Sequence, residues 1–219
     1  DARTRNRVCL SQGASPAWIP KTDEPNVRAF PAALAEFVGR ECVITQKVDG
    51  TSGTYYLRGG EFGVCTRNLE LLEDPAGMFW RIAQDHRLAD ALATLGGDFA
   101  LQGEVHGEGV QGNHLAVKGK TFAAFNLFNI REHSYVGHAP LSEFCRSNNL
   151  PMVREVWRGE LRFTLAELIE LSNRQNYTPG LPAEGIVIRS VEEARSVVLE
   201  SGRLSAKVIS ERYALKHAE

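Results

Sequence analysis

The stretch that most constrains this chain is residues 42–57, with the sequence CVITQKVDGTSGTYYL. Two β-rich runs flank Gly50, a residue that lets the backbone bend where a Cβ would hinder it. Lys47 and Asp49 stand two apart on an extended segment, so their side chains project from the same face. A lysine is costly to place on the inner face of a sheet, and beside a carboxylate it becomes a candidate nucleophile. A surface hairpin with an exposed Lys/Asp pair explains the short motif equally simply.

The composition is that of an ordinary globular protein, with 43% apolar and 24% charged residues in a chain of 219. Its net charge of −2 argues against nucleic-acid binding by overall charge, although a local basic groove remains compatible with it. The four cysteines are widely spaced without a CxxC motif, which favours reduced thiols over zinc or disulfides. No apolar run approaches the roughly 20 residues of a bilayer span. We therefore expect a cytoplasmic protein that does not contact a membrane.

Many short β-rich runs interrupted by a few helices predict an α+β fold with antiparallel sheets. The pattern indicates helices over residues 31–38, 75–95, 140–148, 164–173 and 213–218. It also indicates strands over residues 61–66, 99–106, 121–130, 184–190 and 204–209. Thr164 followed by Glu167 is a capping box for the fourth helix. Residues 1–17 are expected to be a flexible tail or a linker, and residues 18–219 one domain.

Two common nucleotide-binding motifs are excluded, one by the element that follows it and the other by its spacing. Residues 107–112, GEGVQG, match GxGxxG, but the chain then leads into a strand and not into the helix that would bind phosphate. A P-loop needs GxxxxGK[ST], and that spacing is absent from the sequence. No HExxH, GxSxG or protein-kinase set occurs either. The glycine-rich stretch is therefore a structural loop or one that approaches a substrate.

A distributed set of charged residues is more informative than any single motif. Arg67 follows the strand over 61–66, and Glu104 lies on the polar face of the strand over 99–106. Glu184 starts another strand, and Lys207 lies on the last one. Each of these residues alone has an ordinary structural explanation, such as a solvated strand end or an edge-strand lysine. Their order along the chain carries the argument.

In that order the chain resembles the covalent nucleotidyltransferase superfamily of ATP-dependent ligases and capping enzymes. The strings that carry the resemblance are KVDG at 47–50, TRN at 66–68, GE at 103–104, FN at 125–126, EGIV at 184–187 and KVI at 207–209. The strings at 19–24, 64–71 and 207–210, with Gln111 and Asn113, are most similar to the RNA ligase 2 and RNA ligase 5 groups. The resemblance covers about residues 18–216 and implies an ATP-grasp-like nucleotidyltransferase fold with the ATP pocket between the sheets.

The resemblance implies a three-step reaction on RNA. Lys47 would take AMP from ATP as a covalent lysyl-AMP and pass it to an RNA 5′-phosphate, and a 3′-OH would then seal the strand. A break in a duplex, a nick, is the expected substrate. Asp49 and Glu184 would hold Mg²⁺ or Mn²⁺, with Glu104 as a third contact or as an acceptor for the ribose. Each of these acids would bind through oxygen, the ligand such ions prefer.

The same resemblance implies the remaining contacts to ATP. Arg67 would contact the ribose or a substrate phosphate, and Lys207 would face the α-phosphate, where charge develops in the reaction. Phe125 is expected to stack on adenine, with Gln46 near its exocyclic amine. Two positions depart from the family pattern. Ser205 stands where relatives often carry a second lysine, so that phosphate neutralisation would rely more on metal or on Arg189. Asn126 stands where relatives often carry aspartate, which argues against a metal role at that position.

Alternative functions stay open at this point. A DNA ligase core, a GTP-using capping enzyme and a catalytically silent nucleic-acid-binding module would each share the fold. The leading interpretation is the adenylyltransferase domain of an ATP-dependent RNA ligase that acts in RNA repair. It predicts a monomer acting on nicked RNA or RNA/DNA duplex, with an OB domain upstream in the full-length protein.

Overall fold

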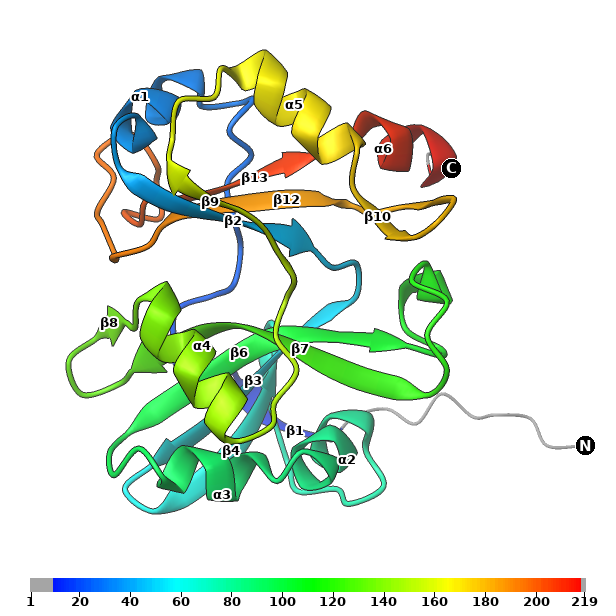
Figure 1. The fold of residues 1–219 in the computed structure, drawn as a ribbon. Helices are drawn as coiled ribbons and strands as arrows, with labels where there is room; N and C mark the ends of the chain where they lie inside the picture. Colours follow the sequence, from blue (N-terminus) through cyan, green and yellow to red (C-terminus); the bar gives the residue numbers. More distant parts are fainter. Residues whose placement is uncertain (1–9, 218–219) are drawn as a thin grey trace, which may run out of the picture.

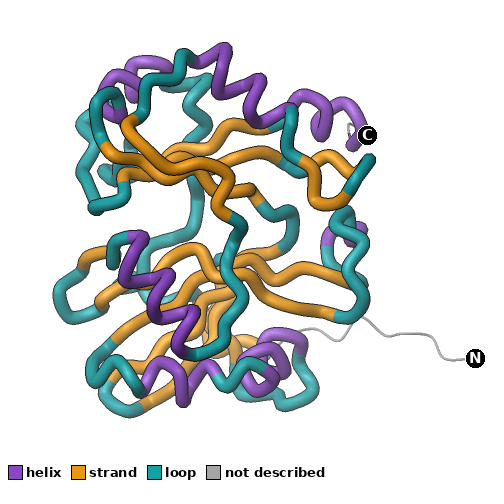
Figure 2. The backbone as a smooth tube through the Cα atoms, in the orientation of Figure 1, coloured by secondary structure: helices purple, strands orange, loops and turns teal. Residues whose placement is uncertain are grey.

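Two antiparallel β-sheets face each other across a cavity, and helices cover the outer face of each (Figure 1). The computed structural model describes residues 10–217. Figure 2 shows the strands of the two sheets as inner layers and most of the helical segments outside them. The predicted α+β class with antiparallel sheets flanked by helices is confirmed. No helix within residues 10–217 is both long enough and apolar enough to span a bilayer.

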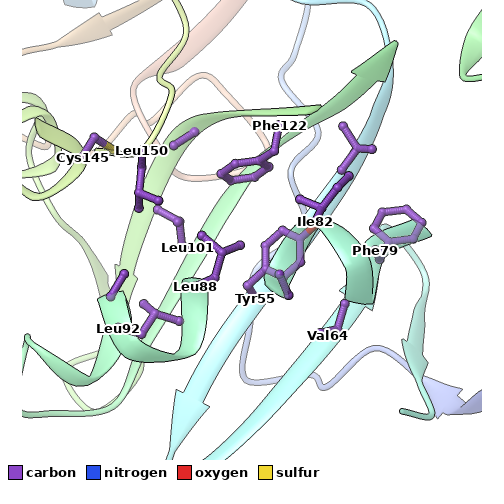
Figure 3. Packing of buried hydrophobic residues seen from close by; sticks show 14 of the residues in the cluster. Tyr55, Val64, Phe79, Ile82, Leu88, Leu92, Leu101, Phe122, Cys145 and Leu150 are labelled. Atoms are coloured by element: carbon purple, nitrogen blue, oxygen red, sulfur yellow. The ribbon is translucent and has the colours of Figure 1, made fainter. Parts of the chain in front are cut away.

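The larger sheet has seven strands in the order β1-β5-β4-β3-β6-β7-β8. Its strands are β1 (Ser11–Ala14), β3 (Thr51–Arg58), β4 (Glu61–Thr66), β5 (Leu69–Leu71), β6 (Phe99–Gly107), β7 (Lys120–Asn129) and β8 (Ser134–Tyr135). The helices α2 (Met78–Asp85), α3 (Leu88–Ala93) and α4 (His138–Ser147) cover its outer face. Between them lies an apolar core in which the ring of Tyr55 meets that of Phe122 edge-on at 5.3 Å (Figure 3). The opposite face of this sheet carries polar side chains such as Glu104 beside smaller apolar clusters around Phe128 and Ala123.

The smaller sheet has four strands in the order β13-β12-β2-β9. They are β2 (Glu41–Lys47), β9 (Glu155–Glu160), β12 (Gly185–Ser190) and β13 (Ser205–Ile209). Its outer helices are η1 (Pro31–Ala33), α1 (Leu34–Phe37) and α5 (Leu165–Asn173), followed at the end of the chain by α6 (Glu211–His217). A short ribbon of β10 (Asn176–Thr178) and β11 (Leu181–Pro182) precedes β12, and the turn η2 (Gln111–Asn113) lies between β6 and β7. The strand β2 is central and pairs with both β12 and β9.

The capping box predicted at Thr164 is present. The Glu167 amide donates to the Thr164 hydroxyl, and the Glu167 carboxylate accepts from the Thr164 amide at 2.8 Å. This reciprocal arrangement satisfies two amides that the first turn of a helix leaves without partners. The predicted start of α5 was therefore correct.

Two predictions about secondary structure were wrong, and one element was missed. The single helix over residues 75–95 is two helices, because Arg87 adopts a left-handed conformation with φ of 51° and ends the first one. The expected tail, residues 1–17, contains β1, which pairs with β5 as an edge strand; residues 1–9 lie outside the described residues. The β10–β11 ribbon, within residues 176–183, has no counterpart among the predicted strands. Short polar strands without alternation gave no periodic signal in these places.

Candidate active site

The cavity between the sheets has a volume of about 280 Å³ and is lined by both of them. The smaller sheet contributes Gln46, Lys47, Val187, Arg189 and Lys207, and the larger sheet and its loops contribute Ser52, Arg67, Glu104, Gln111 and Phe125. Residues 22–24 close a further side. A polar cavity of this size with convergent charged groups is typical of a small-molecule site. Of the predicted site residues, only Asp49 and Glu184 do not line it.

Lys47 ends β2, and its amine donates to the Glu184 carboxylate over 2.8 Å. Lys47 is directly opposite Gly185 in the β2–β12 ladder, so the adjoining Glu184 lies beside the end of β2. Both side chains are about one-fifth exposed, at 22% for Lys47 and 19% for Glu184. Gly185 is required there, because a Cβ would lie 2.2 Å from the Val208 carbonyl oxygen. The structure thus places Lys47 beside Glu184, another of the predicted site residues.

Glu104 lies on β6 and lines the cavity in a half-buried position. Burial raises the pKa of Glu104 to about 8; the Lys47 ammonium lowers it, and the carboxylates of Glu184 and Asp49 raise it further. Glu104 is therefore within electrostatic range of Lys47, Glu184 and Asp49. Such coupling, in a cavity, is a common property of catalytic sites.

Asp49 forms hydrogen bonds that the sequence did not predict. Its carboxylate accepts from His114 Nδ1 over 2.6 Å and bonds the hydroxyl of Tyr213, on α6. Among residues 10–217, no three His, Cys, Asp or Glu side chains converge in a way that could hold a metal ion. The expected set of Asp49, Glu104 and Glu184 is thus brought to one neighbourhood and not assembled into a coordination cluster. His114 and Tyr213 were missed, because no local sequence pattern links them to Asp49.

Tyr177, on the β10–β11 ribbon, was also missed by the sequence analysis. Its hydroxyl accepts from the amides of Asp49 and Glu184 at 2.8 and 3.1 Å, and donates to the Lys47 carbonyl at 3.0 Å. Burial raises the pKa of Tyr177 well above its usual range. No local pattern predicts these bonds, because Tyr177 lies in a loop-like stretch far along the chain from Lys47.

The remaining predicted contacts lie around the cavity. Arg67 forms a bidentate ion pair with Asp23, in which both side chains are more than half exposed. The side-chain amide of Gln46 donates to the Asn176 backbone carbonyl at 3.0 Å and thereby joins β2 to the β10–β11 ribbon. Phe125 and Lys207 reach the cavity from β7 and β13, one on each sheet. A nucleotide can stack its base on an aromatic ring and pair its phosphates with a cation, so a cavity lined by both suits a nucleotide.

A buried ion-pair network lies farther along β12. Arg189 pairs with Glu24 at 2.7 Å and also donates to the Ser205 hydroxyl and the Phe125 carbonyl, both at 2.9 Å. Burial alone would raise the pKa of Glu24, but the guanidinium groups of Arg189 and Arg203 outweigh it and hold that pKa below its usual value. Because Arg189 is already bonded to three groups of the protein, its expected role in neutralising phosphate is not supported by its contacts.

The same network accounts for one departure from the family pattern. Arg203 donates to the Asn126 side chain at 2.9 Å, pairs with Glu193 and lies 3.6 Å from the centroid of the Tyr135 ring. Asn126 in turn donates to Gln102 at 3.0 Å. An amide can accept and donate in this way, whereas a carboxylate only accepts when ionised. Asn126 therefore serves the packing between the two sheets.

Comparison with known proteins places the fold in a class and then in a family. The fold and the lysine-centred cavity are those of the covalent nucleotidyltransferases, as the sequence motifs predicted. A sequence model of the RNA ligase family matches residues 40–209, and the chain belongs to that family. Among curated proteins, a sequence search finds no match. The choice between the RNA ligase 2 and RNA ligase 5 groups stays a prediction.

Solved structures of a Naegleria gruberi RNA ligase resemble the chain over its whole length. The complex with PPi has a TM-score of 0.88 and 27% identity, covering 100% of this chain and 64% of that chain. A mutant with ATP and Mn has a TM-score of 0.88 and 27% identity, covering 99% and 63%. An apo mutant has a TM-score of 0.86 and 28% identity, covering 96% and 61%. The chain thus spans less than two thirds of the length of these relatives.

Proposed function

We propose that this chain is the adenylyltransferase domain of an ATP-dependent RNA ligase, with Lys47 as the residue that becomes covalently adenylylated. The observation that carries the proposal is the placement of Lys47. Its amine lies in the cavity between the sheets, 2.8 Å from Glu184 and within electrostatic range of Glu104. The family match and the solved relatives, one of them with ATP and Mn, support the same conclusion.

In the first step Lys47 attacks the α-phosphorus of ATP. The ammonium form gives up one proton before the attack and the amine a second as the N–P bond forms. The bond between the α-phosphorus and the oxygen bridging to the β-phosphate breaks, and pyrophosphate leaves. A free lysine has a pKa of about 10.4, so its environment must favour the neutral amine.

The later steps return Lys47 to its starting state. An oxygen of the RNA 5′-phosphate attacks the AMP phosphorus, the N–P bond breaks, and the lysine amine is regenerated. The 3′-OH of the adjoining strand then attacks the activated 5′-phosphate, a phosphodiester bond forms, and AMP leaves. We propose a nick in an RNA-containing duplex as the substrate, because sealing needs both ends held together.

The cavity residues divide the binding of ATP between the two sheets. Lys207 faces the α-phosphate, where preorganised positive charge is most effective in the transition state. Phe125 stacks on the adenine, and Gln46 lies near its exocyclic amine. Arg67 contacts the ribose or a substrate phosphate once its exposed pair with Asp23 opens, which costs little because exposed ion pairs are weak.

The acidic residues fit a hard divalent cation by the chemistry of their oxygens. Glu104, Glu184 and Asp49 would hold Mg²⁺ or Mn²⁺ largely through its water molecules, since their carboxylates influence one another without converging. When bound, the ion supplies positive charge that favours the neutral amine of Lys47 and offsets the charge of the phosphates.

Incubation with ATP labelled at the α-phosphate tests the proposal. In the presence of Mg²⁺ or Mn²⁺, the protein should acquire a covalent AMP label that Lys47→Ala abolishes. Lys118→Ala, which removes an exposed lysine outside the cavity, should label normally. Absence of label with every metal would favour a catalytically silent nucleic-acid-binding module, and labelling by GTP but not ATP would indicate a capping enzyme.

Nicked duplexes then decide between the RNA and DNA ligases. We propose that RNA on the 3′-OH side of the nick is sealed faster than DNA, and the reverse order would favour a DNA ligase core. Gel filtration tests the proposed monomer. Sealing by the chain alone, compared with a longer protein carrying an upstream OB domain, tests whether that domain is needed to hold RNA.

A further inference from the structure

We propose that Tyr177 is a positioning residue for the adenylylation of Lys47: its hydroxyl holds the backbones of Lys47, Asp49 and Glu184 in register. The inference rests on the proposed function and extends it to a residue outside the family motifs. Tyr177 belongs to the β10–β11 ribbon and does not line the cavity. It therefore acts on the chemistry through the residues that it holds.

The Tyr177 hydroxyl uses its full hydrogen-bonding capacity on these three residues. A phenol has one proton to donate and accepts two hydrogen bonds in a well-formed site. The proton goes to the Lys47 carbonyl at 3.0 Å, and the oxygen accepts from the Asp49 amide at 2.8 Å and the Glu184 amide at 3.1 Å. All three partners are backbone groups, so the hydroxyl fixes the course of the chain and not the side chains directly.

The position of Tyr177 explains why a side chain is needed there. The β2–β12 ladder ends at the Lys47–Gly185 pair, and beyond it the two strands diverge. Asp49 continues into the turn toward β3, and Glu184 comes from the ribbon. Their amides lie beyond the last ladder pair, and the Tyr177 hydroxyl bonds both. It continues the connection between β2 and β12 past the point where the sheet stops.

The ribbon that carries Tyr177 is itself tied to β2. The side-chain amide of Gln46 donates to the backbone carbonyl of Asn176, one residue before Tyr177, at 3.0 Å. The backbone amide of Ala183 donates to the Gln175 carbonyl at 3.0 Å. The hydroxyl is thus held from two sides. A misplacement of about 1 Å between a nucleophile and its partners can reduce a rate by about a hundredfold. Loss of the hydroxyl should therefore appear in the chemical step.

The test compares Tyr177→Phe with Tyr55→Phe, a matched control. Both substitutions delete a phenol oxygen, from a partly buried side chain at Tyr177 and a fully buried one at Tyr55, but the Tyr55 hydroxyl has no hydrogen-bond partner within the described residues. Single-turnover labelling with ATP is measured over a range of ATP concentrations. We expect Tyr177→Phe to lower the rate constant at saturating ATP by about 10- to 100-fold. The apparent ATP affinity should change less than about threefold, because no cavity contact is removed.

The outcomes separate this inference from the proposed function. If wild-type protein labels and Tyr177→Phe matches it in rate, Tyr177 is not a positioning residue, while the lysyl-AMP proposal stands. The same conclusion follows if only the ATP affinity falls. If wild-type protein does not label, the proposed function fails and this inference fails with it. Partial unfolding would reduce the amplitude of labelling and leave the rate constant unchanged, and circular dichroism of the same sample measures the folded fraction.

Discussion

Two groups of charged residues lie at opposite ends of β12, and they differ in how many hydrogen bonds they form within the protein. Around its start, Lys47, Glu184 and Glu104 form what we call the lysine cluster, with a single short ion pair and an acid of raised pKa. Around its end, Arg189, Glu24 and Arg203 form the arginine network, in which each guanidinium bonds several groups. Charges whose hydrogen bonds are all satisfied hold the sheets together. Charged groups that form fewer hydrogen bonds within the protein remain available to bind a substrate.

The largest effect is expected in the arginine network. Arg189→Met should lower the free energy of unfolding by about 3–5 kcal/mol, because it leaves Glu24 buried without its main partner. Urea unfolding measures the change. The double variant Glu24→Gln with Arg189→Met should recover part of the loss, since it removes the unpaired charge. A loss below about 1 kcal/mol for the single variant would show that this network is no more structural than a surface pair.

Lys207 should behave as part of the lysine cluster. Lys207→Met should reduce the rate of AMP labelling at saturating ATP by about 100- to 1,000-fold, the usual effect of removing one charge-stabilising group. Single-turnover labelling measures it, with Lys118→Met as the control for loss of a lysine outside the cavity. An unchanged rate would exclude Lys207 from the chemistry and leave it a structural residue of β13.

The pH dependence of stability should reveal Glu104. Its pKa in the folded protein, about 8, lies above the ordinary value of 4.5, so the folded state binds the proton more tightly. The protonated form stabilises the fold fully below pH 4.5, and this contribution is lost as the pH rises through 8. Between pH 6 and 9, without nucleotide or metal, we expect a loss of about 2–3 kcal/mol.

Glu104→Gln should abolish most of that pH dependence, because glutamine does not titrate. Urea unfolding at several pH values provides the measurement. Glu108→Gln, an exposed acid on the same hairpin, is the control and should leave the profile unchanged. Equal slopes for wild-type protein and Glu104→Gln would mean that Glu104 is not the buried acid.

The smallest effect is expected at the exposed Arg67–Asp23 pair. Asp23→Asn should change the free energy of unfolding by less than about 1 kcal/mol, since both side chains are more than half exposed. AMP labelling of the same variant shows whether the Arg67–Asp23 pair affects the reaction or only the structure. A larger loss of stability would place this pair with the arginine network and not with the lysine cluster.

Much of the fold followed from local chemistry. The β-rich runs around Gly50 became β2 and β3, and the capping box at Thr164 began α5. The helix predicted over residues 75–95 broke because Arg87 adopts a conformation that its apolar stripe does not disclose. Edge strand β1, four exposed and largely small residues, lacks the alternation that predicts a strand. Periodicity finds elements that bury a face and misses those held by backbone bonds.

The candidate site could likewise be predicted in part, for the residues that lie in short motifs. Lys47, Glu104 and Lys207 could be named because each lies in a short motif of a recognisable superfamily. Tyr177 and His114 could not, since their roles come from bonds to residues that are distant along the chain. Asp49 as a metal ligand stays a prediction, whereas the bonds of its carboxylate to His114 and Tyr213 were not predicted. Motifs identify the groups that react, whereas the fold decides what holds them.

The strand order has a consequence for synthesis of the chain. Lys47 ends β2, whose neighbours in the sheet, β9 and β12, begin at residues 155 and 185. At about 5–20 residues per second, β2 leaves the ribosome at least roughly five seconds before either partner exists. The larger sheet, by contrast, is complete by residue 135. Within residues 10–217, β2 is therefore the second strand to be made and one of the last to be paired, so its edges are open to aggregation in the interval.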